Sequence, residues 1–218
     1  TSNNAEKTVF AWNYDTRGRM VFEMLDLGGV GSGSYAVAYG YNGANLPTSI
    51  TYPGGEMVTT TYNNRMLPVA MSSNRGGGTS LVSGVVYDDK SRLVKMQQGN
   101  GLYTVYTYNA DNISSGRLYQ IAIGTDPNNG GNLFKAQYAY QYNGNISSIT
   151  DLSAAVGSQI STFTYDGADR LTNGGAITST NNLVAAYNET ASYTVTGTLD
   201  MRNNNAYQYD TNHPRAAT

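Results

Sequence analysis

A seven-residue pattern recurs along this chain and constrains its fold more than any other feature. It reads Tyr-Asp-Gly-Ala-Asp-Arg-Leu at 165–171, and close copies begin at Tyr14 and Tyr87. Looser copies keep the same order: an aromatic residue, Asp or Asn, a few turn-forming residues, then a polar and an apolar residue. Self-similarity at this spacing is typical of repeat proteins. We therefore expect one structural unit that is used many times.

The spacing of the pattern indicates the size of the unit. The nine anchor tyrosines are Tyr14, Tyr41, Tyr62, Tyr87, Tyr108, Tyr140, Tyr165, Tyr193 and Tyr209. Their intervals are 27, 21, 25, 21, 32, 25, 28 and 16 residues, with a mean of about 24. That length suits two strands and two turns.

Alternating aromatic residues favour strands over helices. In segments 10–14 and 138–142 the aromatic residues fall on alternate positions, which places them on one face of a strand. No segment carries an apolar stripe at helical spacing for more than a few residues. We predict an all-β fold in which antiparallel β-hairpin repeats form one continuous curled sheet with essentially no helix.

The residues of the pattern have structural explanations. The residue after the anchor is Asp or Asn in most units: Asp15, Asn42, Asn63, Asp88, Asn109, Asp166 and Asp210. Such a side chain accepts hydrogen bonds from backbone amides two residues on, which suits a turn. The tyrosines are explained by cross-strand stacking on one face, where aromatic pairs contribute about 0.5 to 1 kcal/mol each. Gln141 and Thr194 replace the acid in two units, which favours a packing and turn role.

The segments between the tyrosine turns are predicted to be hairpin connections. Segment 27–34 is rich in Gly but lacks the Gly-Lys-Ser/Thr of a phosphate-binding loop. Segment 126–132 resembles a calcium loop faintly, but Gln137 stands where a bidentate Glu is required. Segment 173–175 also reads as a loop. Pro47 and Pro68 cannot donate to a ladder and should lie at strand ends or edges.

Composition argues against several classes of function. The net charge is −2, charged residues make up 13%, and there is no basic run, so neither nucleic acid nor an anionic membrane is an expected partner. No apolar run approaches the roughly 18 residues of a membrane span. There is no Cys, and His213 is the single histidine, predicted to be a turn residue. A histidine-based triad repeated in the units and a multi-histidine metal site are thereby excluded.

Carboxylates offer little support for catalysis. Asp88 with Asp89, and Asp166 with Asp169, are turn residues, whereas a glycosidase needs two carboxylates that face each other across a cleft. We predict no catalytic, metal-binding or cofactor-binding residue. The chain is expected to be a non-enzymatic single domain of about nine units over residues 1–218. Because it starts at Thr1 without Met or a signal-like segment, a fragment or processed piece of a longer protein is expected.

The turns that begin at Tyr14, Tyr87 and Tyr165 resemble the YD repeat of the RHS proteins. That family includes bacterial polymorphic toxins, cage components of insecticidal toxin complexes and animal teneurins. Segments 99–108, 144–151 and 213–218 resemble further stretches common in bacterial members, so the resemblance covers nearly the whole chain. It implies a β-sheet ribbon that spirals into a hollow toxin shell.

The resemblance implies a shell or scaffold segment of a secreted or cell-surface bacterial protein, with the rest of the parent RHS protein or copies of itself as partners. An alternative is a subunit of an extracellular filament joined through strand edges. A second alternative is an adhesion module whose exposed tyrosines bind a surface glycan or protein, as the likeness to teneurins permits.

Overall fold

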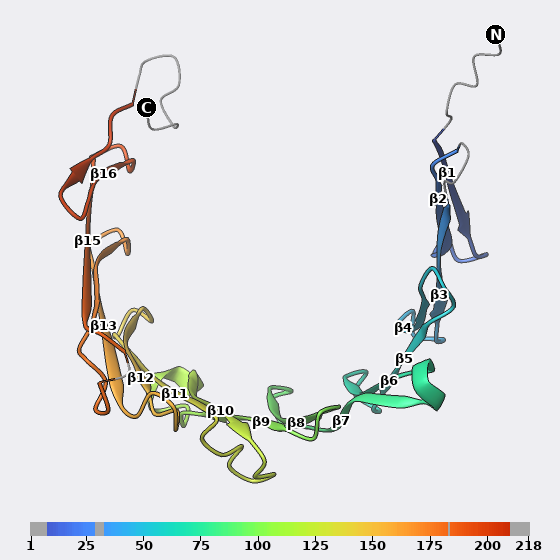
Figure 1. Cartoon of the computed structure of the whole chain (residues 1–218), viewed down its shortest axis with the longest axis horizontal. Helices are drawn as coiled ribbons and strands as arrows, with labels where there is room; N and C mark the ends of the chain where they lie inside the picture. The colour runs from blue at the N-terminus through green and yellow to red at the C-terminus, as the bar shows by residue number, and fades with distance from the viewer. Residues whose placement is uncertain (1–7, 29–32, 183, 210–218) are drawn as a thin grey trace. The chain divides into compact units, whose positions relative to one another are not determined.

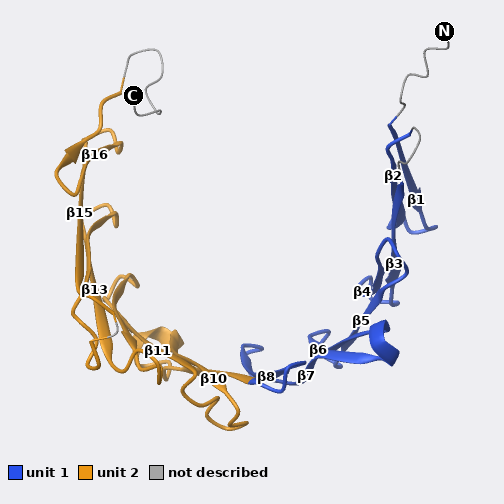
Figure 2. Cartoon of the chain, in the orientation of Figure 1, with its two compact units in different colours: residues 1–102 blue, residues 103–218 orange. Residues whose placement is uncertain are grey.

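The computed structural model describes residues 8–28, 33–182 and 184–209. These residues form 17 β-strands and two short 3-10 turns, and none of them lies in an α-helix. The predicted fold class, an all-β chain of antiparallel hairpin repeats, is confirmed. Predictions on residues 29–32 of the glycine-rich segment, on Asp210 and on His213 lie outside the described residues. Two compact units, 1–102 and 103–218, divide the chain (Figure 2).

The first unit is a sheet in which each strand pairs antiparallel with the next along the chain (Figure 1). Its strands are β1 (Val9–Tyr14), β2 (Met20–Asp26), β3 (Ser34–Tyr41), β4 (Pro47–Thr51), β5 (Met57–Tyr62), β6 (Pro68–Ser73), β7 (Thr79–Tyr87) and β8 (Leu93–Gln98). A 3-10 turn, η1 (Arg75–Gly77), lies between β6 and β7. The tyrosine turns all follow odd-numbered strands and therefore share one edge of the sheet.

The second unit repeats this sequential pairing from β9 to β17. Its strands are β9 (Tyr103–Tyr108), β10 (Leu118–Gly124), β11 (Phe134–Tyr140), β12 (Ile146–Asp151), β13 (Gln159–Tyr165), β14 (Leu171–Ala176), β15 (Tyr187–Tyr193), β16 (Leu199–Arg202) and β17 (Asn205–Ala206). A second 3-10 turn, η2 (Ser114–Gly116), precedes β10. In both units we call the edge with the tyrosine turns the turn edge, and the other the opposite edge.

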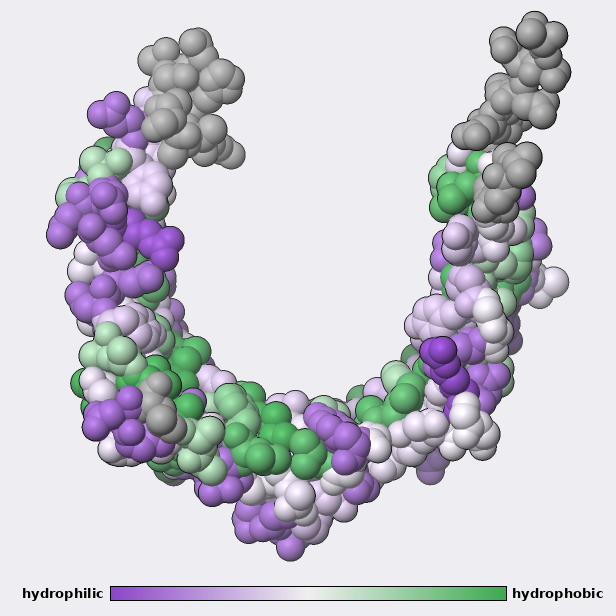
Figure 3. Space-filling model, in the orientation of Figure 1, coloured by the Kyte–Doolittle hydropathy of each residue, from purple (hydrophilic) through white to green (hydrophobic). Residues whose placement is uncertain are grey.

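Each unit is a single layer of strands with little core (Figure 2). The buried apolar residues of the described chain are Val105, Ala122, Ala136 and Ala176. Large apolar side chains remain at the surface beside polar ones (Figure 3), as with Trp12, which is 53% exposed. Hydrophobic burial alone therefore gives this sheet little of its order, and hydrogen bonds between strands and between repeats must supply more of it.

The prolines lie where the sequence predicts. Pro47 is the first residue of β4 and Pro68 the first residue of β6, so each opens the strand that returns from a tyrosine turn. Neither position requires a backbone N–H, which proline lacks. The prediction that both prolines lie at strand ends is confirmed.

Two local predictions were wrong. Segment 173–175 is part of strand β14 and not a loop. Gly174 lies under the ring of Phe163, and Gly175 lies close to the backbone of Tyr187, so neighbouring residues supply the packing that the glycines lack. Tyr142 does not continue the alternation of β11, because the strand ends at Tyr140 and Tyr142 stands fully exposed in the following turn.

Two strand glycines of the second unit predict opposite responses to an added methyl group. A Cβ at Gly124 would lie 2.3 Å from the carbonyl oxygen of Gly130, whereas a Cβ at Gly174 would make ordinary contact with Phe163 at 3.5 Å. We expect Gly124→Ala to lower the free energy of unfolding by about 1 to 3 kcal/mol, measured by urea titration. Gly174→Ala should leave it unchanged or raise it by up to about 1 kcal/mol. Equal losses would contradict the described packing.

Candidate functional site

The tyrosine turns share one set of hydrogen bonds, seen clearly at residues 166–170. The amide of Asp166 donates to the carbonyl of Arg170 at 2.9 Å, and the amide of Asp169 donates to the carbonyl of Asp166 at 3.0 Å. Oδ1 of Asp166 accepts from the amides of Ala168 (2.9 Å) and Arg170 (3.0 Å). Asp169 has a left-handed backbone with φ of 60°. This is a three-residue hairpin loop with a β-bulge.

The same four bonds recur at Asp15, Asn42, Asn63 and Asp88. An asparagine therefore shapes the turn as well as an aspartate, because one side-chain oxygen accepts both amides. Where Gln141 or Thr194 takes this position, the two backbone bonds of the turn remain. The Asn109 turn is longer: the Asn109 amide donates to the carbonyl of Arg117 at 2.9 Å, and η2 lies between them.

Most tyrosine turns are joined to the preceding hairpin by the hydroxyl group of their tyrosine. Tyr165 donates to the carbonyl of Ile146 at 2.9 Å, and Ile146 is the first residue of β12, the return strand of the preceding hairpin. Seven anchors make this bond, each to the first residue of the preceding return strand: Tyr41 to Met20, Tyr62 to Pro47, Tyr87 to Pro68, Tyr140 to Leu118, Tyr165 to Ile146, Tyr193 to Leu171 and Tyr209 to Leu199. We call this bond the hydroxyl link.

The hydroxyl link is needed because the backbone ladder between neighbouring hairpins stops before the turn edge. Between β2 and β3 the last pair is Phe22 with Ala38, so the ladder ends before Tyr41. Between β12 and β13 the last pair is Ser148 with Thr162. At the turn edge a long side chain thus makes the bond between hairpins that the backbone does not make. Tyrosine combines that reach with a hydroxyl donor.

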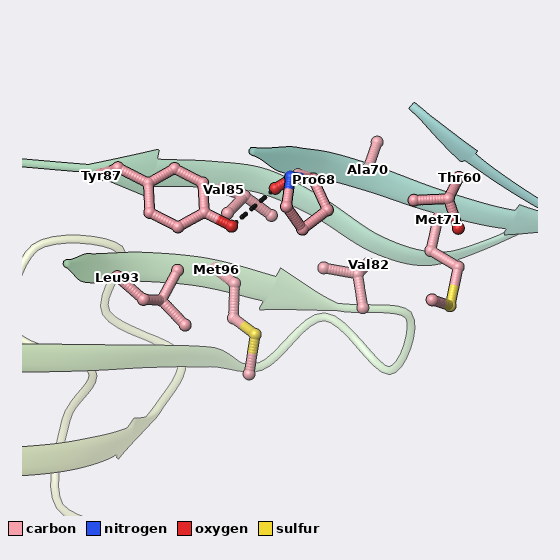
Figure 4. A pocket seen from close by; sticks show the side chains of 9 residues that line it. All are labelled: Thr60, Pro68, Ala70, Met71, Val82, Val85, Tyr87, Leu93 and Met96. Carbon is pink, nitrogen blue, oxygen red and sulfur yellow. Dashed lines mark hydrogen bonds between the residues drawn. The ribbon is translucent and has the colours of Figure 1, made fainter. Parts of the chain in front are cut away.

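One hydroxyl link lies at an apolar hollow. Figure 4 shows Tyr87 on β7 with its hydroxyl group directed to the carbonyl of Pro68, at 2.7 Å, beside the side chains of Leu93 and Met96. The hollow is lined by Thr60, Pro68, Ala70, Met71, Val82, Val85, Tyr87, Leu93 and Met96. The ring of Tyr87 is part of this apolar lining, while its hydroxyl group donates to the backbone. One side chain thus makes both an apolar contact and a hydrogen bond.

An arginine strengthens the contact between successive turns. Nε of Arg170 donates to Oδ2 of Asp166 at 2.7 Å, within its own turn. The same guanidinium lies over the ring of Tyr193 in the next hairpin, 4.6 Å from the ring centroid. Arg19 stacks on Tyr41 in the same way at 4.7 Å. A cation is attracted to the face of an aromatic ring. The arginine therefore connects the aspartate of its own turn to the tyrosine of the following hairpin.

The carboxylates of these turns are held in their charged form. The side chain and the amide of Arg170 lower the pKa of Asp166, and Asp15 is affected in the same way by its own arginine. At Asp88 burial opposes the shift, but the amide and guanidinium of Arg92 outweigh it and the pKa is lowered. Carboxylates that are ionised and already hydrogen-bonded are poor proton donors. This chemistry suits a structural turn.

Within each compact unit the structure joins the predicted anchors to the preceding turns through the seven hydroxyl links given above. Tyr14 is 62% exposed and donates no link to the described residues, and Asp210 lies outside them. Sequence reasoning treated the tyrosines as a stack of rings and missed the hydroxyl link and the arginines. A signal for the arginines was present, since Arg19, Arg92 and Arg170 each lie five residues after an anchor tyrosine.

Among the described residues, no group of three or more His, Cys, Asp or Glu side chains is placed to hold a metal ion. No helix in this part of the chain is long and apolar enough to cross a membrane.

The turn edge and the sequential strand pairing define a class: a β-hairpin repeat protein whose successive turns are joined by side chains. Neither a protein-family model nor a curated relative matches the sequence. Solved structures do share the fold. The chain matches TcdB2-TccC3 without its hypervariable C-terminal region with a TM-score of 0.73 and 15% identity, over 94% of this chain and 12% of that one.

Two further structures give similar values. The match to TcdB2-TccC3-Cdc42 has a TM-score of 0.70 and 16% identity, over 89% of this chain and 11% of that one. The match to the Photorhabdus luminescens Tc holotoxin pore has a TM-score of 0.69 and 14% identity, over 92% and 11%. The chain thus has the RHS/YD-repeat fold, and it spans about a tenth of the length of these proteins.

The hydroxyl link predicts a small, specific effect of removing one oxygen atom. Tyr165→Phe keeps the ring and deletes the bond to Ile146, so the free energy of unfolding should fall by about 0.5 to 1.5 kcal/mol. Tyr142→Phe is the matched control, because that side chain is fully exposed, and its effect should stay within about 0.5 kcal/mol. Urea titration followed by circular dichroism measures both. Equal effects would mean that the link contributes nothing.

The lowered pKa of Asp166 predicts a loss of stability in acid. Because the pKa is lower in the folded state, the contribution is complete above the unfolded value of about 3.9 and is lost as pH falls through the folded value. Asp166→Asn and Arg170→Gln should each weaken the dependence of unfolding free energy on pH below about 4. The double variant should match Asp166→Asn alone, because that substitution already removes the titrating carboxylate. Additive changes would show that the two residues act separately.

Proposed function

We propose that the chain is a non-enzymatic structural protein, a shell or scaffold segment of a secreted or cell-surface bacterial RHS/YD-repeat protein. The observation that carries this proposal is the hydroxyl link, which joins successive units at seven of the anchors. The most recurrent residues of the sequence are thus engaged in holding one repeat to the next. Such bonds suit a wall whose task is to keep its form.

The polar groups of the turn edge support the same proposal. The carboxylate of Asp166 accepts two amides and the guanidinium of Arg170, so its oxygens are occupied by the protein itself. Asp15 and Asp88 are occupied in the same way. Ligand binding at these residues would have to break bonds that the turn needs. The recurring polar groups of the turns therefore bond to the repeats themselves.

The fold and the length of the chain support a partner of the same kind. Its match to chains of Tc toxin structures extends over nearly all of its length but about a tenth of theirs. Each compact unit is a single layer of strands, which suits a segment of a wall, and further repeats of a parent protein are the partner that would extend it. A filament of copies and a glycan- or protein-binding module are the competing functions, and they differ in measurable ways.

The proposal predicts a discrete particle without a small ligand. Native mass spectrometry and electron microscopy should show monomers of 23.4 kDa over a wide range of concentration, and a glycan array should give no saturable binding. Regular fibres that grow with concentration, and that disappear on Trp12→Lys in edge strand β1, would support the filament instead. Saturable glycan binding that Tyr142→Ala abolishes, with the circular dichroism spectrum unchanged, would support the adhesion module.

A further inference from the structure

Tyr14 breaks the pattern of the anchor tyrosines. The other anchors of the described chain are half-buried, and seven of them donate a hydroxyl link. Tyr14 is 62% exposed, and its hydroxyl has no acceptor among the described residues. Its own turn is nonetheless complete, since Asp15 makes all four bonds of the shared set. The tyrosine is therefore placed to donate, and no carbonyl of the described residues receives its bond.

The strand that carries Tyr14 has a free side. Within the described residues β1 pairs with β2 alone, so the backbone groups on its other side are unpaired. Exposed edges are commonly protected by lysine, proline or a very short strand. β1 has six residues, Val9-Phe10-Ala11-Trp12-Asn13-Tyr14, with neither lysine nor proline. It has the features of a strand that is normally covered.

One face of the sheet at β1 carries exposed aromatic side chains. Phe10 and Trp12 are 58% and 53% exposed, and their rings stack with centroids 6.0 Å apart. They line a hollow with Met24 on β2 and Tyr35 on β3. Exposed aromatic side chains in register with a free strand are the elements by which a sheet accepts an added strand: backbone bonds give affinity, and side chains give specificity.

We propose that the free side of β1 is a docking site for an antiparallel β-strand that begins directly after a turn of the same kind. The first residue of that strand would accept the hydroxyl link of Tyr14. The arginine before it would stack on the Tyr14 ring, as Arg19 stacks on Tyr41 and Arg170 on Tyr193. The inference rests on the proposed structural function and on continuity with the contact seven anchors already make.

A hairpin of this kind fits better than a second copy of the chain. The last strand of the described chain, β17, has two residues, Asn205–Ala206, whereas β1 offers six. The described return strands also have their first carbonyls occupied, as with Leu199, which already accepts from Tyr209. A partner for Tyr14 must therefore bring a free return strand of its own. The hairpin β13–β14 of this chain is a suitable probe, because it contains both Arg170 and Leu171.

The test places a copy of residues 159–176 in front of the complete chain, so that residues 1–8 connect the added hairpin to β1. The connections on the opposite edge have similar lengths, 152–158 between β12 and β13 and 177–186 between β14 and β15. Trp12 is the single tryptophan of the sequence and lies in β1, so its fluorescence reports on this edge directly. A chain extended by a Gly/Ser segment of equal length is the control.

We expect the added hairpin to shift Trp12 emission to shorter wavelength and to reduce its quenching by acrylamide, while the Gly/Ser extension does neither. Amide hydrogen exchange in β1 should slow by about tenfold or more, which corresponds to 1.4 kcal/mol of docking free energy. In the hairpin fusion, Tyr14→Phe should make amide exchange in β1 about two- to tenfold faster again, the range expected for the loss of one hydrogen bond. Arg170→Gln in the added copy alone should also reduce it.

Three results would overturn the proposal. Trp12 could be quenched equally in both extended chains, which would mean that the hairpin does not dock. Protection could be unaffected by Tyr14→Phe and by the arginine substitution, which would mean unspecific covering of an apolar edge. Protection could coincide with a doubled mass, which would make a second copy the occupant. None of these bears on the unextended chain, whose mass and glycan binding test the proposed function separately.

Discussion

The structure depends on a hydrogen bond from a tyrosine hydroxyl to a backbone carbonyl of the preceding repeat. A single-layer sheet has little core to order it, and only Val105, Ala122, Ala136 and Ala176 are buried apolar residues in the described chain. Twisting strands favour neighbouring hairpins that separate at one end, and the backbone ladders do stop before the turn edge. The hydroxyl link acts where the ladder is missing. It turns a row of hairpins into a connected sheet.

The repeated motif therefore contributes contacts within its own hairpin and to the neighbouring hairpin. The aspartate shapes its own turn, and the turn brings the next residues of the chain to the edge. There the arginine faces the tyrosine of the following unit, and the carbonyl after it accepts the hydroxyl. Degenerate copies lose the part that can be replaced: Gln141 and Thr194 give up the carboxylate, while Tyr140 and Tyr193 keep their links. The tyrosine, which no backbone group can replace, is retained.

The sequence was sufficient for the hairpins and insufficient for the contacts between them. Local turn chemistry and alternation locate the strands, and Pro47 and Pro68 mark strand starts, because these are properties of neighbouring residues. The acceptor of the hydroxyl link is a backbone atom on Met20, Pro47 or Leu171, so no side-chain type reveals it. Gly174 and Gly175 were misread for the related reason that Phe163 and β15 determine their conformation. Contacts that depend on the register between strands cannot be read from the residue types of one segment.

The link also explains where the repeats can differ in length. The turn edge holds five-residue connections, as at 15–19, 88–92 and 166–170, because a longer turn would displace the arginine and the carbonyl together. The exception, 109–117, inserts η2 and still closes with Arg117, whose guanidinium lies 5.6 Å from the Tyr140 ring centroid. The opposite edge has no such constraint, and its connections range from 203–204 to 177–186. Contacts between repeats limit the length of the connections at the turn edge, so the repeats differ in length mainly at the opposite edge.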